Sequence, residues 1–269
     1  AGDPTAQFNL GMAYAEGAGV PQDYKAAEKW LHMAAEQGAA RAQANLGWMY
    51  ETGTGVKKDE KEAFKWNRKA AEQGIASSQT GLGLAYLSGN GTKQDNREAV
   101  KWFQKAAIQE DVLAQHVLGT LYAAGKGVKR DDVEAVKWWR KAADQGYDDA
   151  QFQLGIAYDF GRGVAIDDSK AVEWYRKAAD QGLANAQYAL GLHLFSGDDI
   201  AQDKEESVRW YRKAAAQGQV DAQYNLGCLL FNGDGVPQDR QEAMIWIRKA
   251  AEQGHPDAQA ALKEFSLPN

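Results

Sequence analysis

The sequence has one cysteine, Cys228, and only four histidines among its 269 residues. A single cysteine excludes an internal disulfide framework and any metal site built from several thiolates. The histidines lack the spacing of metal ligands, so we expect no metal and no cofactor. Basic residues are not in excess either, since 31 Lys and Arg stand against 37 Asp and Glu, a formal net charge of −6. This balance speaks against a nucleic-acid partner, because such proteins need a basic face.

Long apolar runs are also missing. No stretch approaches the roughly 18–20 consecutive apolar residues of a membrane span, so we expect no direct membrane insertion. No serine begins a Ser-x-x-Lys nucleophile motif, and the Gly-x-Gly-Val segments lack the third glycine of a dinucleotide fingerprint. Cys228 has no histidine on its own predicted helix, which argues against a cysteine nucleophile. We therefore predict that the protein is not an enzyme.

What the sequence has in abundance is a 36-residue period. A Leu-Gly pair recurs at this spacing without insertion, and a glutamine precedes each leucine by three residues. All glycines except Gly2 and Gly81 fall in four columns of the repeat, and all tryptophans except Trp48 and Trp139 fall in one. The repeat leaves little composition for a separate catalytic domain. The leucines of the pairs are Leu10, Leu46, Leu82, Leu118, Leu154, Leu190 and Leu226.

Each repeat is expected to form two helices. In the first, Leu10 and Tyr14 fall at helical spacing with other apolar residues, which predicts an amphipathic helix near residues 4–16. Glycines at 17 and 19 then supply a helix end and a turn. Asp23 is the expected N-cap of a second helix that stops at Gly38, because its carboxylate can accept free first-turn N–H groups. In five repeats a glutamate follows this aspartate by three residues, a spacing that resembles a capping box.

A single hairpin of this kind cannot bury both faces, whereas stacked hairpins share one continuous core. We therefore predict an all-α fold, a right-handed α/α superhelical solenoid that forms one domain over residues 1–269. A capping helix is expected at 256–265, and the protein is expected to be a monomer. The seven hairpins are predicted at 4–39, 40–75, 76–111, 112–147, 148–183, 184–219 and 220–255.

These columns resemble the Sel1-like repeat, a relative of the tetratricopeptide repeat with a longer loop between its helices. The resemblance covers essentially the whole chain. Departures are confined to single columns, such as Glu110 for the closing glycine and Asp199 for the second loop glycine. The fifth repeat shows the pattern at Ala150, Leu154, Gly155, Tyr158, Gly161, Gly163, Val164, Asp167, Ala171, Trp174 and Lys177 through Gly182.

The resemblance implies a non-catalytic adaptor, a scaffold that binds a protein or peptide in its concave groove. Bacterial members of the family are often exported, and several are tied to host contact or envelope assembly. A bacterial protein with a role in virulence, in the periplasm or secreted, is therefore expected, and a cytoplasmic location stays open. The alternative function is a receptor for a small ligand or a cell-wall glycan or peptide fragment.

In the related tetratricopeptide geometry, the first helix of each hairpin lines the groove. We expect five positions to project there: the fifth and second before the leucine of Leu-Gly, and the second, fifth and sixth after it. An aromatic second before the leucine fits family packing as well as binding, whereas Phe160, Phe195 and Phe231 lie outside the repeat pattern and are either a binding patch or part of the core. The predicted partner-binding residues are Trp48, Phe152, Asp159, Phe160, Tyr188, Phe195, Tyr224 and Phe231.

The second helices carry a column of arginines. One interpretation is a stripe that binds anions. The other, which we favour, is a solvated face with cations near the C-terminal ends of helices, where the helix dipole stabilises them. The column contains Arg68, Arg140, Arg176, Arg212 and Arg248.

Overall fold

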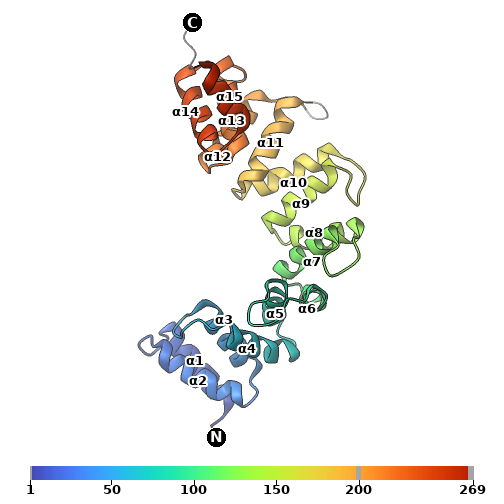
Figure 1. The fold of residues 1–269 in the computed structure, drawn as a ribbon. Coiled ribbons are helices and arrows are strands. Elements are labelled where there is room, and N and C mark those ends of the chain that lie inside the picture. The colour runs from blue at the N-terminus through green and yellow to red at the C-terminus, as the bar shows by residue number, and fades with distance from the viewer. Residues whose placement is uncertain (1, 198–200, 266–269) are drawn as a thin grey trace. The chain divides into compact units, whose positions relative to one another are not determined.

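The computed structural model describes residues 2–197 and 201–265, so Asp199 lies outside the described residues. Within these ranges every regular element is an α-helix (Figure 1), which confirms the predicted all-α succession of hairpins and a last helix. The helices are α1 Pro4–Glu16, α2 Tyr24–Glu36, α3 Ala40–Thr52, α4 Glu60–Glu72, α5 Ala76–Ser88, α6 Asn96–Ile108, α7 Val112–Ala124, α8 Asp132–Asp144, α9 Asp148–Asp159, α10 Asp168–Asp180, α11 Ala184–Ser196, α12 Lys204–Ala216, α13 Val220–Asn232, α14 Arg240–Glu252 and α15 Pro256–Phe265.

The chain forms two compact units that divide within α8, between Lys141 and Ala142. In the first unit α1 packs on α2, α3 on α4 and α5 on α6, and in the second α9 packs on α10, α11 on α12 and α13 on α14. Within each unit, the two helices of a hairpin pack more extensively on each other than on the next hairpin. One continuous right-handed solenoid over residues 1–269 stays a prediction.

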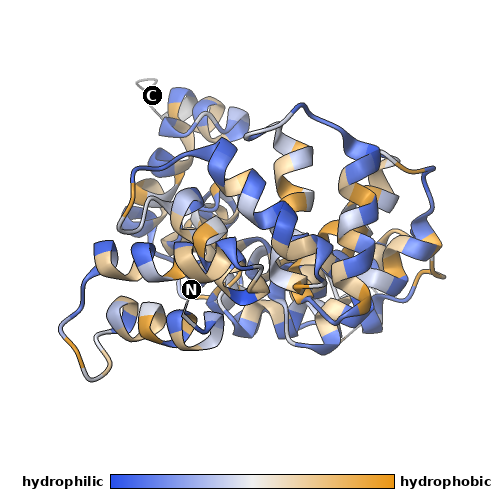
Figure 2. Cartoon of the chain, turned by 90° about the horizontal axis from the view of Figure 1, so that it is seen from below, coloured by the Kyte–Doolittle hydropathy of each residue, from blue (hydrophilic) through white to orange (hydrophobic). Residues whose placement is uncertain are grey.

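The core of each hairpin is built around the Leu-Gly pair. The leucines from Leu46 to Leu226 are fully buried. The glycine lets the second helix approach closely, since a Cβ added to Gly155 would lie 2.4 Å from ring atoms of Tyr175. Figure 2 shows hydrophobic and hydrophilic bands on the same helices, as expected for elements that bury only one side. A large side chain from the second helix therefore covers the glycine of the first.

The predicted aspartate caps are confirmed. Asp59 Oδ1 accepts the N–H of Lys61 at 2.9 Å, and Asp239 Oδ1 accepts that of Glu242 at 2.9 Å. Such bonds satisfy backbone donors that the helix itself leaves without a partner. The same kind of bond is made by Asp23, Asp95, Asp131, Asp167 and Asp203.

The predicted capping box is wrong. It requires the glutamate to accept the backbone N–H of the capping residue. That N–H instead donates to a carbonyl of the preceding helix, as from Asp59 to Tyr50 at 3.0 Å and from Asp239 to Leu230 at 2.9 Å. The tertiary fold therefore supplies the acceptor, and the glutamate turns to cations. Glu62 pairs with Lys65, and Glu206 pairs with Arg176.

Two glutamines per repeat tie the helix ends together. Gln187 of α11, 4% exposed, donates from Nε2 to the Ala179 carbonyl of α10 at 3.2 Å. Its Oε1 accepts Nε2 of Gln217, the C-cap of α12, at 2.9 Å, and Gln217 Nε2 also donates to the Gly182 carbonyl at 2.8 Å. We call this paired arrangement the glutamine relay. Its glutamine-to-glutamine bond recurs at Gln43–Gln73, Gln79–Gln109, Gln151–Gln181 and Gln223–Gln253.

Removing one relay glutamine is expected to destabilise the fold. Gln187→Met keeps the length and much of the volume of the side chain but leaves the Ala179 carbonyl and the Gln217 amide without their buried partner. The free energy of unfolding should fall by about 2 kcal/mol, measured by urea denaturation. Gln241→Met, at an exposed position of α14, is the control and should change it by less than about 0.5 kcal/mol. Equal stability of the two variants would contradict a structural role for the relay.

Candidate functional site

Each unit presents a face made by the first helices of its hairpins, which we call the first-helix face. In the first unit this face includes α3 and α5, with Trp48 exposed to 52% and Leu84 to 36%. Both residues stand second after the leucine of their repeats, at a position predicted to project outward. In the second unit Leu192, at the same position of α11, is exposed to 40%. The column therefore exposes apolar side chains in both units.

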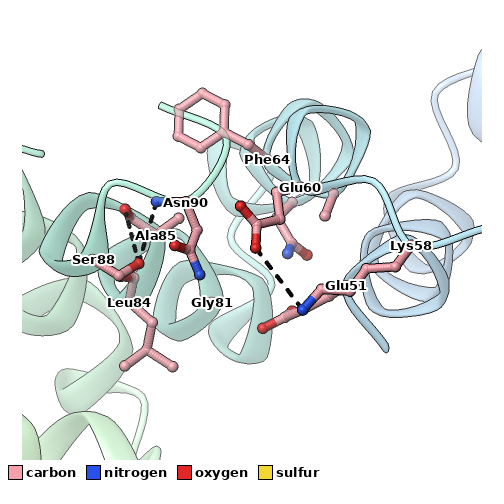
Figure 3. Close-up of a pocket in the computed structure, with 11 residues that line it drawn as sticks. Glu51, Lys58, Glu60, Phe64, Gly81, Leu84, Ala85, Ser88 and Asn90 are labelled. Carbon is pink, nitrogen blue, oxygen red and sulfur yellow. Dashed lines mark hydrogen bonds and ion pairs between the residues drawn. The ribbon is translucent and has the colours of Figure 1, made fainter. Parts of the chain in front are cut away.

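Two hollows open beside Trp48 and Leu84. One, of about 130 Å³, is lined on α5 by Leu84, and the other, of about 270 Å³, is lined on α3 by Trp48. Both hollows share Glu51, Asn67 and Gly81. We call the smaller hollow the Asn67 pocket, and Figure 3 shows it between α4 and α5. Its full lining is Glu51, Lys58, Glu60, Ala63, Phe64, Asn67, Gly81, Leu84, Ala85, Ser88 and Asn90.

Asn67 departs from its column in the second helices. It is 8% exposed, and a Cβ on Gly47 would lie 2.2 Å from its Oδ1, so it covers the glycine as its counterparts do. Sequence reasoning missed this residue, although the signal was present: a single polar side chain in an otherwise apolar column. Gly81, one of the two glycines outside the repeat pattern, was a second signal. The counterparts of Asn67 are Leu31, Phe103, Trp139, Tyr175, Tyr211 and Ile247.

The rim of the Asn67 pocket carries more negative than positive charge. Glu51 and Glu60 contribute carboxylates, and Lys58 contributes the single ammonium group of the lining. Lys58 Nζ lies 3.9 Å from Glu60 Oε1, a long ion pair drawn as a dashed line in Figure 3. Glu51 makes no ion pair with another described residue and is exposed. The pocket thus combines acceptor groups with apolar walls from Phe64 and Leu84.

Phe160 is the most exposed of the predicted aromatic residues. Helix α9 ends at Asp159, so Phe160 is its C-cap, and its side chain is 62% exposed. The Arg162 guanidinium lies 5.4 Å from the centroid of its ring. An exposed ring on the last turn of a helix is a suitable anchor for a partner. Its binding role stays a prediction.

Asp159 already has partners within the second unit. Its Oδ2 accepts the hydroxyl of Tyr175 at 2.9 Å and lies 3.4 Å from His193 Nε2. Burial, together with the nearby Asp159 carboxylate, raises the pKa of Tyr175 above its usual range, because both disfavour a phenolate. Asp159, a predicted partner-binding residue, thus also makes an internal hydrogen bond. Its binding role stays a prediction.

The predicted aromatics that stand second before the leucine contact the protein itself. Phe152 lies with its ring centroid 5.7 Å from that of Tyr175, and Tyr188 lies 5.9 Å from Tyr211. Tyr224 stacks on His255 at 4.4 Å. Burial, assisted by a hydrogen bond with Cys228, raises the pKa of Tyr224 to about 12. These contacts favour the packing interpretation of the column.

Phe195 and Phe231 are half-buried and differ from Phe160 in this respect. Both pack against the core cluster of the second unit that includes Leu226 and Leu230. A cation covers each ring, since Lys204 Nζ lies 5.1 Å from Phe195 and the Arg240 guanidinium 5.1 Å from Phe231. The three phenylalanines therefore do not form one uniformly exposed patch.

The arginine column of the second helices is largely neutralised. Arg176 pairs with Glu206 and Arg212 with Glu242, one repeat further along the chain. Each glutamate also accepts an indole N–H, Glu206 from Trp210 at 3.0 Å. The Arg176 guanidinium holds the pKa of Glu206 below its usual value, and Arg212 does the same for Glu242. This arrangement favours the structural interpretation over an anion-binding stripe.

Other chemistry is sparse in the part of the chain that the structure describes. There, no three His, Cys, Asp or Glu side chains cluster in a way that would hold a metal ion. Burial raises the pKa of the Cys228 thiol, which makes it a poorer nucleophile. None of the helices within residues 2–197 and 201–265 combines the length and the apolar character needed to cross a membrane.

Comparison with known proteins identifies the repeat. The family model for the Sel1 repeat matches seven consecutive segments. No curated protein matches the sequence. The matched segments are residues 4–38, 40–75, 76–111, 112–147, 148–183, 184–219 and 220–255.

Solved structures of similar sequence exist. A protective antigen present in uropathogenic Escherichia coli strains, which displays an SLR fold, is 42% identical with a TM-score of 0.92. The alignment covers 97% of this chain but only 56% of the antigen, so the chain spans little more than half of that relative. A Sel1 repeat protein from Oxalobacter formigenes is 37% identical with a TM-score of 0.79, over 98% of this chain and 76% of the other.

The pairing of Arg176 with Glu206 predicts a pH-dependent contribution to stability. Because the pKa of Glu206 is lowered in the folded state, its stabilising effect is present above its unfolded value of 4.5 and is lost as pH falls through the lower folded value. Glu206→Gln should reduce the free energy of unfolding by about 0.5–1 kcal/mol at pH 7, and the difference from the parent should shrink below pH ~4.5. Urea denaturation at several pH values measures it. The exposed neighbour Glu205 provides the control Glu205→Gln, and a deficit independent of pH would contradict the ion pair as its cause.

Proposed function

This chain belongs to the Sel1 repeat family, whose members are generally protein-interaction scaffolds, and on that basis we propose that it is a non-catalytic adaptor that binds a protein or peptide partner on its first-helix face. The observation that carries the proposal is the exposure of Trp48 on α3 and of Phe160 at the C-cap of α9, at 52% and 62%, although the repeat leucines of both helices are fully buried. Each residue is an exposed apolar group within its own unit, and exposed aromatic side chains are the usual anchors of interaction surfaces.

The size of the two hollows beside Asn67 favours a polypeptide over a free small ligand at this place. Pockets that bury a drug-sized molecule measure about 300–1,000 Å³. The two hollows beside Asn67, at about 130 and 270 Å³, are smaller and suit one side chain of a larger partner. The receptor for a glycan or cell-wall fragment therefore ranks second.

One relative supports a setting for the proposed adaptor. The Escherichia coli relative is described as a protective antigen of uropathogenic strains, which is consistent with a bacterial protein exposed to a host. We therefore propose a monomeric adaptor in the periplasm or outside the cell, with a role in host interaction or in the assembly of an envelope complex. Cell fractionation of the native host tests the location.

Truncation of the exposed aromatics is expected to weaken partner binding strongly. Trp48→Ala and Phe160→Ala remove side chains that the core does not need, so each variant should keep the circular dichroism spectrum of the parent. A partner captured by the parent, identified by mass spectrometry and purified, should bind the variant lacking its anchor about 30-fold more weakly, the loss typical of an interface hot spot. Isothermal titration calorimetry measures this change.

Controls of matched chemistry are available on the second helices. Ile108→Ala and Ile245→Ala truncate apolar side chains that are exposed to 72% and 54%. They should bind the partner as the parent does. A loss in these variants and not in Trp48→Ala or Phe160→Ala would move the site to the second-helix face. Phe195→Ala and Phe231→Ala are unsuitable, because both rings pack on the core and their loss would destabilise the unit.

A further inference from the structure

Asn67 places a polar side chain at a position that the other repeats fill with apolar or aromatic groups. The corresponding side chains in the other six repeats are large and apolar or aromatic, and they cover the glycine of the first helix. Asn67 is 8% exposed, and its carboxamide makes no hydrogen bond with another described residue. The amide oxygen and nitrogen reach solvent through the two hollows that Asn67 lines, so a ligand can reach them as well. A ligand that bonds to the amide would give it a fixed partner.

Small residues around Asn67 keep the space open. Gly81 stands where other repeats have side chains such as Asn45 and Gln153, and Ala44 stands where most repeats have an aromatic. A Cβ on Gly81 would lie 3.3 Å from Asn67 Nδ2, so any longer side chain there would cover the carboxamide. The second hairpin thus combines a buried polar group with the access that a ligand needs.

The charges of the pocket select a cationic occupant. Glu51 and Glu60 outnumber Lys58, which lies 3.9 Å from Glu60, so the lining has a net negative charge. Figure 3 shows the side chains of Glu60 and Asn90 pointing toward the same space between α4 and α5. A ligand rich in hydrogen-bond donors would find carboxylate and amide oxygens in this space. An acidic ligand would meet two carboxylates.

The shape favours arginine over lysine. A guanidinium carries five donors in one plane, so it can bond to a carboxamide at the floor and to carboxylates at the rim together. It also stacks on aromatic faces, and Trp48, 52% exposed, lines the adjoining hollow. The three methylenes of the side chain would contact Leu84 and Phe64.

We propose that the Asn67 pocket binds an arginine side chain of the protein partner. The inference rests on the proposed adaptor function, because it assigns the arginine to that partner. The partner would present a basic segment, whose arginine enters between α4 and α5 while neighbouring apolar side chains cover Trp48.

The test uses a small probe, so that it does not depend on finding the partner. The full ¹⁵N-labelled chain is titrated with N-acetyl-arginine amide, and the side-chain amide signal of Asn67 and the indole signal of Trp48 are followed by NMR. Both signals should shift saturably. N-acetyl-lysine amide should bind at least about fivefold more weakly, since it lacks the planar fork. N-acetyl-glutamate amide and N-acetyl-norleucine amide should leave the signals unchanged.

Two variants separate the pocket from the fold. Gly81→Gln introduces the residue found at the equivalent position 153 and covers the carboxamide, so it should abolish the shift of Trp48 without lowering Tm. Asn67→Leu reproduces the packing of Leu31, so it should abolish the same shift and raise Tm by about 3 °C. Equal responses to the arginine, lysine and norleucine probes, or an unchanged response in Gly81→Gln, would overturn the proposal.

Failure of the arginine pocket can be distinguished from failure of the proposed adaptor function. If the arginine probe does not bind but Trp48→Ala still loses a purified partner, the first-helix face binds that partner without an arginine in this pocket, and only the present inference fails. If the probe binds and no variant of the exposed aromatics affects partner binding, the pocket stands and the placement of the adaptor surface fails.

Discussion

The glutamine relay is the interaction on which the repeat depends. A carboxamide has both an acceptor and donors, so one buried glutamine can bond to a helix-end carbonyl and to a second glutamine at once. Gln187 makes these bonds to Ala179 and Gln217 while only 4% exposed. A glutamate at this position would lack the donor, and a methionine would lack both the donor and the acceptor. The eight-residue step from Ala179 to Gln187 also fixes the length of the short turn between hairpins, which explains why the period tolerates no insertion there.

The relay also accounts for where variation is tolerated. In a repeat protein, stability is roughly a sum over repeats and their contacts with neighbours. The hairpin that contains Asn67 has the relay bond Gln43–Gln73, and the next hairpin has Gln79–Gln109, so its ends stay fixed although its core column carries a polar residue. One hairpin can therefore carry a polar residue in the core column and stay folded. The same freedom on the first helices allows Trp48 to occupy an exposed position without affecting the buried Leu46 beside it.

Most of the fold could be predicted from the sequence, because the same residues that form helices, caps and turns recur in each of the seven repeats. The helix ends and aspartate caps follow from backbone chemistry within a few residues. The capping box was wrong because the N–H of the cap finds its acceptor on another helix, as Asp59 does at Tyr50, and no local pattern reports that contact. The surroundings of the predicted site residues were harder to predict for a related reason. Whether Phe195 is exposed, or Asp159 unengaged, depends on side chains from the neighbouring second helix. Asn67 is the one polar residue at its repeat position, but this becomes clear only when the second-helix residues of all repeats are compared.

Fixed helix ends beside the Asn67 pocket would favour binding there. In a looser structure, α3 and α5 would close over an unpartnered carboxamide, or the amide would turn to a backbone group. Here the ends of both helices are fixed by relay bonds to Ala35 and Ala71, at 3.0 and 3.1 Å. The carboxamide is therefore already held in place at the pocket when a donor enters. A preorganised polar group beside an exposed indole can thus bind a ligand with few contacts, because the site loses little conformational entropy on binding.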